Sequence, residues 1–354
     1  MRLKMLVLPS FLVALLAIFV CSRPSGNLVG QDQLKWSLFT EADPVAIDAG
    51  PFLSVFFFDK NNGIAISPIT IDKTIDGGTN WSAVQNWDEN NRGFSSLVSA
   101  NGQLWIVGSE NNRPFILTTI NQGFTWEDWN KVDFVGGGLE RRKEFTKFTD
   151  LCFDQSGSAW AVGDGGVVQL RPDDKDMQVL SIIGSKDILY SISCDSSGHV
   201  WAAGENNTVL RYHDGWKRIE SGKLATFWKV VAYEKETWLL GEENPSNEKN
   251  LRKGILLRSK NGGQTWEDVT PESANVLRDI SISGEGGWLV GDGGSLYSTK
   301  DRGTSWNKEK SPTQNNLFSI FFLNSQNVWV VGDRASVIKY QNFSELQPPR
   351  NNVW

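Results

Sequence analysis

The chain is poor in the residue types that most often carry catalysis and metal binding. Its 354 residues include two histidines, three cysteines, five tyrosines and three methionines. His199 and His213 are each expected to be a lone structural residue, which leaves no histidine pair for a metal and no Ser-His-Asp or Cys-His arrangement. The net charge of −6 and the absence of a dominant basic cluster argue against a nucleic-acid partner. We expect no metal and no cofactor.

Tryptophan and glycine are abundant instead, with 16 and 34 copies. Together with the few methionines, they favour short strands and tight turns over helices. A hydrophobic content of 40% and a charged content of 21% are typical of a globular chain. No long stretch shows helical periodicity.

The N-terminus differs from the rest of the chain. Arg2 and Lys4 precede an apolar run from Met5 to Val20, which predicts an exported protein with residues 1–22 as a signal peptide or retained anchor. Lipidation of Cys21 would need a small residue before it, and Val20 is bulky, so we favour cleavage near Ser22. The periplasm, the cell envelope and a thylakoid lumen all fit. We assign residues 23–33 to a linker.

One octet occurs four times. It reads "TIDGGTNW" (residues 74–81), "TINQGFTW" (119–126), "SKNGGQTW" (259–266) and "TKDRGTSW" (299–306). The shared pattern is Ser or Thr, any residue, Asp or Asn, any residue, Gly, two further residues and Trp. We predict a hairpin turn in which the third residue accepts backbone N–H groups and glycine supplies a positive φ. The structural residues are Asp76, Trp81, Asn121, Trp126, Asn261, Trp266, Asp301 and Trp306.

A second pattern, Trp-x-x-Gly, begins at tryptophans 105, 160, 201, 238, 288 and 329. A seventh copy is degenerate, with Ile64 at the tryptophan position. Spacings of roughly forty residues are those of propeller blades. We therefore predict an all-β, seven-bladed β-propeller of four-stranded blades over residues 34–345, with residues 346–354 as a tail. The segment 34–40 completes the last blade and closes the ring, because Trp36 matches Trp216.

These motifs resemble the Asp-box, or BNR, repeat of sialidase-like propellers. The Trp-x-x-Gly strands and the C-terminal "VWVVGDRASVIKY" resemble more closely the YCF48-like family. That family includes exported seven-bladed propellers that act as photosystem II assembly or stability factors. The resemblance implies a non-enzymatic protein-binding scaffold, which we expect to be monomeric. The fold alone does not fix the function.

A sialidase-like protein that binds or cleaves glycans is the alternative. Sialidase catalysis needs three arginines, a tyrosine with a glutamate, and an acidic proton donor, and the family carries an Arg-Ile-Pro motif that is missing here. Tyr212 and Tyr340 fall on expected third strands, away from the axis. Other glycosidases need only two facing carboxylates, which this sequence neither indicates nor excludes.

Cys152 and Cys194 are expected on the inner strands of adjacent blades. A one-residue offset points them to opposite blade faces, which are the faces that meet. A contact and a disulfide are both open, and we favour buried free thiols.

Two long loops are expected on the face opposite the octets. Long loops on a rigid scaffold are where binding residues concentrate. The first, 130–145, carries Arg141, Arg142 and Lys143, and the second, 243–254, carries Arg252 and Lys253. We predict these five residues as the partner-binding set, with solvated surface charge as the alternative.

Five of the six Trp-x-x-Gly strands are followed by an acidic residue, at positions 164, 205, 242, 292 and 333. We expect these acids to cap turn N–H groups. A rim for a cation or a basic peptide is the other interpretation.

Overall fold

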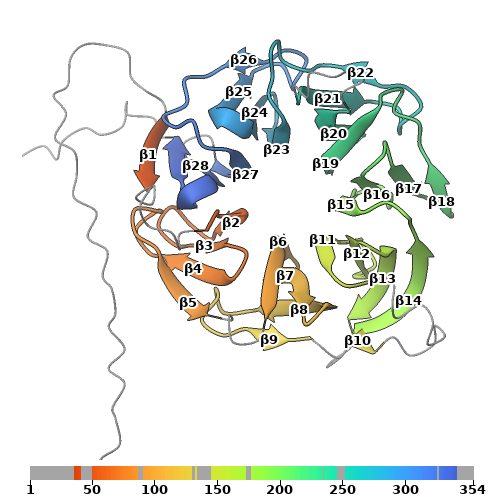
Figure 1. Cartoon of the computed structure of the whole chain (residues 1–354), viewed down its shortest axis with the longest axis horizontal. Coiled ribbons are helices and arrows are strands. Elements are labelled where there is room, and N and C mark those ends of the chain that lie inside the picture. The colour runs from red at the N-terminus through yellow and green to blue at the C-terminus, as the bar shows by residue number, and fades with distance from the viewer. Residues whose placement is uncertain are drawn as a thin grey trace, which may run out of the picture. The chain divides into compact units, whose positions relative to one another are not determined.

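The computed structural model describes residues 36–40, 50–86, 91–129, 132–133, 145–172, 177–233, 235–244, 252–324 and 327–340. Seven sheets radiate from one axis (Figure 1). The seven-bladed all-β propeller predicted from the repeats is confirmed. No helix among these residues is both long and apolar enough to cross a membrane.

Within a blade, successive strands of the chain lie progressively farther from the axis, except in blades 7 and 3, whose outermost strands β1 (Trp36–Thr40) and β10 (Val132–Asp133) come first in sequence. Blades 1 and 2 comprise β2 (Ser54–Phe57), β3 (Gly63–Ile66), β4 (Thr70–Thr74) and β5 (Ser82–Asn86), then β6 (Arg92–Ala100), β7 (Gln103–Glu110), β8 (Arg113–Thr119) and β9 (Glu127–Asp128). Blades 3 and 4 comprise β11 (Phe148–Phe153), β12 (Ala159–Gly163), β13 (Gly166–Pro172) and β14 (Met177–Gly184), then β15 (Leu189–Cys194), β16 (Val200–Gly204), β17 (Val209–Tyr212) and β18 (Trp216–Arg218).

Blades 5 and 6 comprise β19 (Ala225–Tyr233), β20 (Glu236–Glu243), β21 (Gly254–Ser259) and β22 (Glu267–Asp268), then β23 (Leu277–Ser283), β24 (Gly286–Gly291), β25 (Ser295–Thr299) and β26 (Asn307–Lys308). Blade 7 comprises β27 (Leu317–Asn324), β28 (Asn327–Gly332), β29 (Val337–Tyr340) and β1 (Trp36–Thr40). Two short 3-10 turns are η3 (Asp292–Gly294) and η4 (Asp333–Ala335). Blade 3 gains a fifth strand, because β10 (Val132–Asp133) pairs in parallel with β14.

The ring closes as the sequence predicts. β1 pairs antiparallel with β29, and Trp36 lies opposite Tyr340. In blade 4, Trp216 lies opposite Tyr212 in the same way. The N-terminal strand therefore supplies the outer strand of the last blade, and pairing of this kind hides a sheet edge.

The octets form hairpin turns between the third and fourth strands. The third residue accepts the backbone N–H four positions later in every copy, at 2.9 Å from Asp76, Asn121 and Asp301 and 3.0 Å from Asn261. The first hydroxyl accepts the N–H of the octet glycine, for example Gly303 at 2.8 Å. That glycine has a φ of 72°, a conformation that favours glycine.

Each octet glycine also lies against the preceding blade. A Cβ on Gly303 would approach the Trp238 ring to 2.5 Å, and one on Gly123 would approach Ile64 to 2.7 Å. Ile64 therefore occupies the tryptophan position, as the degenerate seventh repeat predicts. The two repeats meet across blade junctions, since the turn of one blade packs on the second strand of the blade before it.

A cation from the third strand strengthens this contact. Arg258 lies opposite Trp238 in the strand pairing, with its guanidinium 5.2 Å from the ring centroid. It donates to the Arg302 carbonyl at 2.9 Å. Similar donations run from Arg211 to the Gly262 carbonyl at 2.5 Å and from Lys73 to the Gln122 carbonyl at 3.3 Å.

The Trp-x-x-Gly glycines allow a close backbone approach. A Cβ on any of the six would lie within 2.2 Å of a carbonyl oxygen at the start of the first strand of the same blade, or of the residue just before it. Real side chains cannot occupy that space, so glycine is required by packing at the end of each second strand.

Replacing Gly291 by alanine tests this requirement. The new Cβ would lie 2.2 Å from the Val276 carbonyl oxygen, so we expect the free energy of unfolding to fall by about 2–4 kcal/mol. Gly286→Ala in the same strand is the control, because its nearest neighbour would be 3.7 Å away. Urea denaturation of both variants is the measurement. Equal stability of the two would contradict the packing argument.

The octet carboxylate gives a pH-dependent prediction. Hydrogen bonds from the side chain and backbone of Ser305 lower the pKa of Asp301 from 3.8 to about 2. A lowered folded-state pKa stabilises the fold above the unfolded pKa, and this contribution is lost as the pH falls from about 5 to about 2. The melting temperature of wild type should therefore exceed that of Asp301→Asn at neutral pH and converge with it in acid.

The reverse substitution is the control for Asp301→Asn. Asn121→Asp places a carboxylate in an equivalent turn and should gain stability only above about pH 4. A difference between Asp301→Asn and wild type that does not change with pH would show that the charge of the carboxylate is irrelevant to the turn.

Candidate functional site

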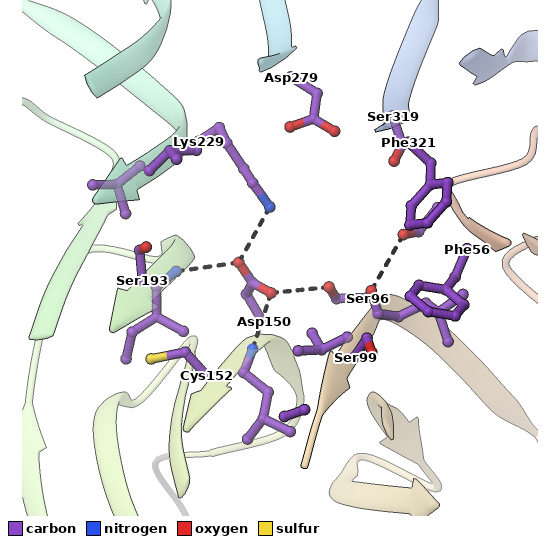
Figure 2. A pocket seen from close by; sticks show the side chains of 18 of the residues that line it. Phe56, Ser96, Ser99, Asp150, Cys152, Ser193, Lys229, Asp279, Ser319 and Phe321 are labelled. Carbon is purple, nitrogen blue, oxygen red and sulfur yellow. Dashed lines mark hydrogen bonds and ion pairs between the residues drawn. The ribbon is translucent and has the colours of Figure 1, made fainter. Parts of the chain in front are cut away.

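The seven inner strands surround a pocket of about 450 Å³ on the axis (Figure 2). Equivalent positions of these strands form a ring at one level, made of Ser54, Ser96, Asp150, Ser191, Lys229, Asp279 and Ser319. A register shift between the first and second strands precedes this position in six blades. The shift is a β-bulge, which re-aims a side chain.

Asp150 is held by the two neighbouring blades. Its carboxylate accepts hydrogen bonds at 2.9 Å from both Ser96 and Ser191, and at 3.2 Å from the Ile192 N–H. Lys229 approaches it with a 3.7 Å distance between Nζ and Oδ2 (Figure 2). Asp150, followed by the more distant Asp279, raises the pKa of Lys229 against the opposing effect of burial.

Asp279 makes a similar junction between blades 6 and 7. It accepts the N–H of Ile320 at 3.0 Å and that of Ile280 at 2.9 Å. Burial raises the pKa of Asp279, although Lys229 and these hydrogen bonds oppose the increase. The axial charges therefore fasten blades to one another.

The pocket does not resemble a sialidase centre. Its described lining contains neither arginine nor tyrosine, whereas sialidase chemistry would need an arginine trio and a tyrosine. Within the described ranges, no group of three or more His, Cys, Asp or Glu residues could hold a metal ion.

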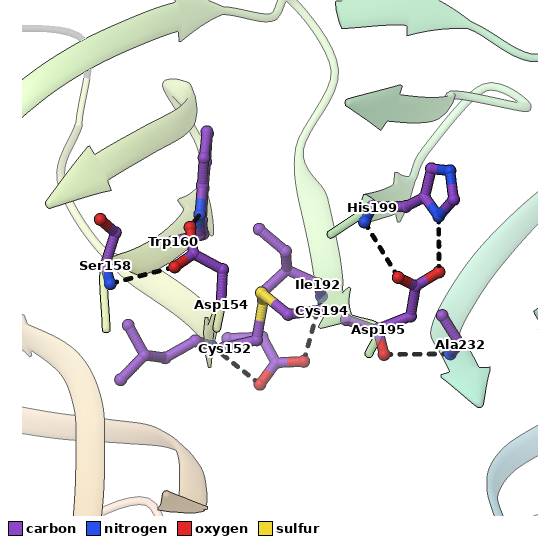
Figure 3. Close-up of a disulfide and its surroundings, with 12 residues drawn as sticks. Cys152, Asp154, Ser158, Trp160, Ile192, Cys194, Asp195, His199 and Ala232 are labelled. Atoms are coloured by element: carbon purple, nitrogen blue, oxygen red, sulfur yellow. Dashed lines mark hydrogen bonds and ion pairs between the residues drawn. A yellow bond between two sulfur atoms is a disulfide. The ribbon is translucent and has the colours of Figure 1, made fainter. Parts of the chain in front are cut away.

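Cys152 and Cys194 form a disulfide with a Cα–Cα distance of 5.7 Å (Figure 3). The expectation of free thiols is therefore wrong. The physical reason is the one-residue offset, which directs the two side chains at each other across the junction of blades 3 and 4. Both sulfur-bearing residues also line the axial pocket.

The two histidines are not isolated, contrary to expectation. Their ring centroids lie 4.5 Å apart, and His199 Nδ1 lies 2.9 Å from Asp195 Oδ2 (Figure 3). The cause is strand register. Val200 pairs with Tyr212, so His199, just before Val200, lies next to His213, just after Tyr212.

A row of stacked side chains crosses blades 4–7 on the face of the long loops. It consists of Tyr190, Trp228, Arg278 and Phe318, and we call it the aromatic–arginine row. The Tyr190 and Trp228 ring centroids are 4.4 Å apart. The Arg278 guanidinium lies 4.8 Å from the Trp228 ring centroid and 5.9 Å from that of Phe318. All four side chains are half-buried bulge residues.

Acids after the second strands hold this row in place. Asp292 binds Arg278 through two contacts of 2.8 and 2.9 Å. Glu205 accepts the Tyr190 hydroxyl at 2.8 Å and the Ile188 N–H at 3.2 Å. Burial, followed by this hydrogen bond, raises the pKa of Tyr190.

The expected capping of N–H groups is seen at two of the five acids. Asp164 accepts the N–H groups of Thr146 and Lys147, and Glu205 accepts the Ile188 N–H. Asp292 instead holds an arginine side chain.

The predicted basic set is only partly within the described structure. Arg141, Arg142 and Lys143 lie outside the described residues. Arg252 and Lys253 precede β21 on the long-loop face, and both side chains are 64% exposed. Arg252 Nε lies 3.5 Å from Glu242 Oε2, and Lys253 Nζ lies 3.8 Å from Glu243 Oε2. Each basic side chain therefore has an acidic neighbour.

Sequence reasoning missed the aromatic–arginine row. The sequence does contain a pattern that reveals the row, because each of its members is the residue just before a member of the axial ring. Aligning the inner strands places Tyr190, Trp228, Arg278 and Phe318 in one column.

Comparisons with known proteins support a YCF48-like β-propeller. The family model described as photosynthesis system II assembly factor YCF48 matches residues 272–341, which contain the four strands of blade 6 and the strands β27, β28 and β29 of blade 7. The chain is 23% identical over 303 residues to the chloroplastic photosystem II stability/assembly factor HCF136 of Arabidopsis thaliana, covering 82% of this chain and 63% of the relative. It is 24% identical over 241 residues to the photosystem II assembly lipoprotein Ycf48 of Trichormus variabilis, covering 64% of this chain and 50% of the relative.

Solved structures agree with the fold. YCF48 bound to a D1 peptide superposes with a TM-score of 0.66 at 17% identity, covering 89% of this chain and all (100%) of that one. A streptogramin B lyase gives a TM-score of 0.64 at 12% identity, with coverages of 86% and 97%. At these identities the likeness shows the fold alone.

Removing the disulfide should destabilise the ring. The bridge spans 42 residues of sequence, and closing a loop of this length typically stabilises by about 2–4 kcal/mol. We expect Cys152→Ser/Cys194→Ser to unfold at a lower urea concentration than wild type. A reductant should weaken wild type and leave the double variant unchanged. An effect of reductant on neither protein would contradict a stabilising bridge.

Proposed function

We propose that this protein is an exported, non-enzymatic scaffold that binds a protein partner during assembly or stabilisation of photosystem II. The observation that carries the proposal is the aromatic–arginine row on the long-loop face. Rigid aromatic and arginine side chains are the residue types that most often dominate the free energy of protein–protein binding.

The row suits an extended segment of a partner. Arg278 is held flat by Asp292 and lies between two aromatic rings, so its guanidinium is already ordered before binding. An ordered side chain loses little conformational entropy on association. Arg252 and Lys253 stand on the same face and would guide an acidic partner to it.

The comparisons support the partner class. The relatives are named as photosystem II assembly or stability factors, and one structural neighbour is YCF48 with a D1 peptide. We propose that a photosystem II subunit is the partner here as well, and that the site of action is the thylakoid lumen. Arg141, Arg142 and Lys143 remain proposed members of the binding surface.

Co-purification from a photosynthetic membrane fraction tests the partner. The tagged full-length chain should retain photosystem II subunits, and binding of a D1 peptide should be measurable by fluorescence anisotropy. If neither occurs, the photosystem assignment fails.

Two variants test the surface separately. Trp228→Ala and Arg278→Ala should each weaken peptide binding about tenfold or more, equivalent to at least about 1.4 kcal/mol. Tyr233→Ala, at the opposite end of the same strand, and Lys308→Ala on an outer strand are the matched controls. Equal losses in all four variants would show that the row is not the binding surface.

Arg252→Glu and Lys253→Glu examine the predicted basic residues. Exposed rim charges act mainly on association rate and salt dependence. We expect slower association at low salt with little change in dissociation rate. Association that is unaffected at low salt would favour the interpretation of solvated surface charge.

A further inference from the structure

Two adjacent octet turns expose large apolar side chains. Ile75 in blade 1 is 73% exposed, and Ile120 and Phe124 in blade 2 are 71% and 70% exposed. The turns are joined by Lys73, whose ammonium donates to the Gln122 carbonyl at 3.3 Å and lies 3.3 Å from the Phe124 ring centroid. We call Ile75, Ile120 and Phe124 the apolar tip patch.

The octet fold does not require apolar side chains at these positions. The equivalent residues in blades 5 and 6 are Lys260 and Gln264, then Lys300 and Thr304. In all four turns, the third residue nevertheless accepts the same backbone N–H through its side-chain oxygen. Exposed apolar clusters mark interaction sites, so these positions are the candidates for a contact outside the ring.

The described chain enters the ring on this same face. β1 begins at Trp36, which lies opposite Tyr340 at the end of the third strand, where an octet turn would follow. Blade 7 adjoins the first octet, since Trp329 donates to the Gly77 carbonyl at 2.9 Å (Figure 1). The predicted signal or anchor, residues 1–22, thus precedes in sequence a strand that starts on the same face of the ring as the apolar tip patch.

The charged side chains at these turns leave a small positive excess. Lys60, Lys73 and Lys339 accompany Asp59 and Asp76. Both carboxylates accept N–H groups of their own turns, and Lys339 reaches Gly77 from blade 7. A single excess charge steers a partner only weakly, so apolar insertion is the main chemistry that the turns offer. Projecting turn tips suit a bilayer, which needs no preformed pocket for each side chain.

We propose that the octet face of blades 1 and 2 docks on a lipid bilayer by inserting Ile75, Ile120 and Phe124 at the boundary of headgroups and acyl chains. The opposite face, with the aromatic–arginine row, then points away from the lipid. This inference does not depend on the identity of the protein partner.

An environment-sensitive dye on the full-length chain tests the proposal. The dye is attached at Thr125→Cys or at Thr265→Cys, with Cys21 replaced by serine. These threonines are equivalent, since each accepts the side-chain amide of its octet asparagine at 2.8 Å. With phosphatidylcholine vesicles, the dye at 125 should shift to the blue and the dye at 265 should not.

A charge-neutral variant removes the patch. Ile75→Thr/Ile120→Thr/Phe124→Gln should need at least about tenfold more lipid for the same shift, since three apolar side chains no longer leave water. Because the local charge excess is small, the wild-type shift should occur on phosphatidylcholine alone, and phosphatidylglycerol should strengthen it only modestly and only at low salt. The readout is local, so a retained N-terminal anchor would not mimic it.

The proposal is overturned if neither dye shifts, or if both shift equally. It is also overturned if the dye at 125 responds to solubilised membrane proteins and not to vesicles, since the patch would then bind protein. Loss of photosystem co-purification would leave the vesicle result unaffected, so the two proposals fail separately.

Discussion

The ring depends on how each blade is fastened to the next. At four junctions, an octet turn contacts side chains of the preceding blade. The octet glycine leaves room for an aromatic ring or an isoleucine side chain. A backbone carbonyl of the turn accepts a hydrogen bond from a side chain of that blade. Blades 3, 4 and 7 have no octet. Their junctions are fastened at the axis instead, by Asp150, by the disulfide and by Asp279. Adjacent blades are therefore held together in two ways, by octet turns at four junctions and by axial carboxylates or the disulfide at the other three.

Much of this architecture could be predicted from the sequence because each repeat has a local cause. Glycine is demanded by close approach or positive φ, and the octet acid by unpaired turn N–H groups. The third-strand cations Arg211 and Arg258 also follow a rule, since each precedes a blade that carries an octet. Nothing inside a single repeat reveals that rule. It emerges only when two neighbouring blades are compared.

The failures of prediction have two origins. The histidine pair follows from strand register, because Val200 pairs with Tyr212. The disulfide follows from a one-residue offset that the sequence already shows, but an offset that brings two cysteines together does not decide between free thiols and a bond. The aromatic–arginine row follows from the bulge that precedes the axial position. Spacing along the chain locates the strands, but contacts between blades require knowledge of which residues oppose one another.

The swapped outer strand has a consequence for the order of folding. β1 is the first of the described propeller strands to be synthesised, and its partner β29 is the last. Contacts of such long sequence separation form late and slow the folding of a chain. During synthesis the propeller therefore remains an open arc with unpaired edge strands until β29 is made, and a deletion of β29 would leave both edges unpaired.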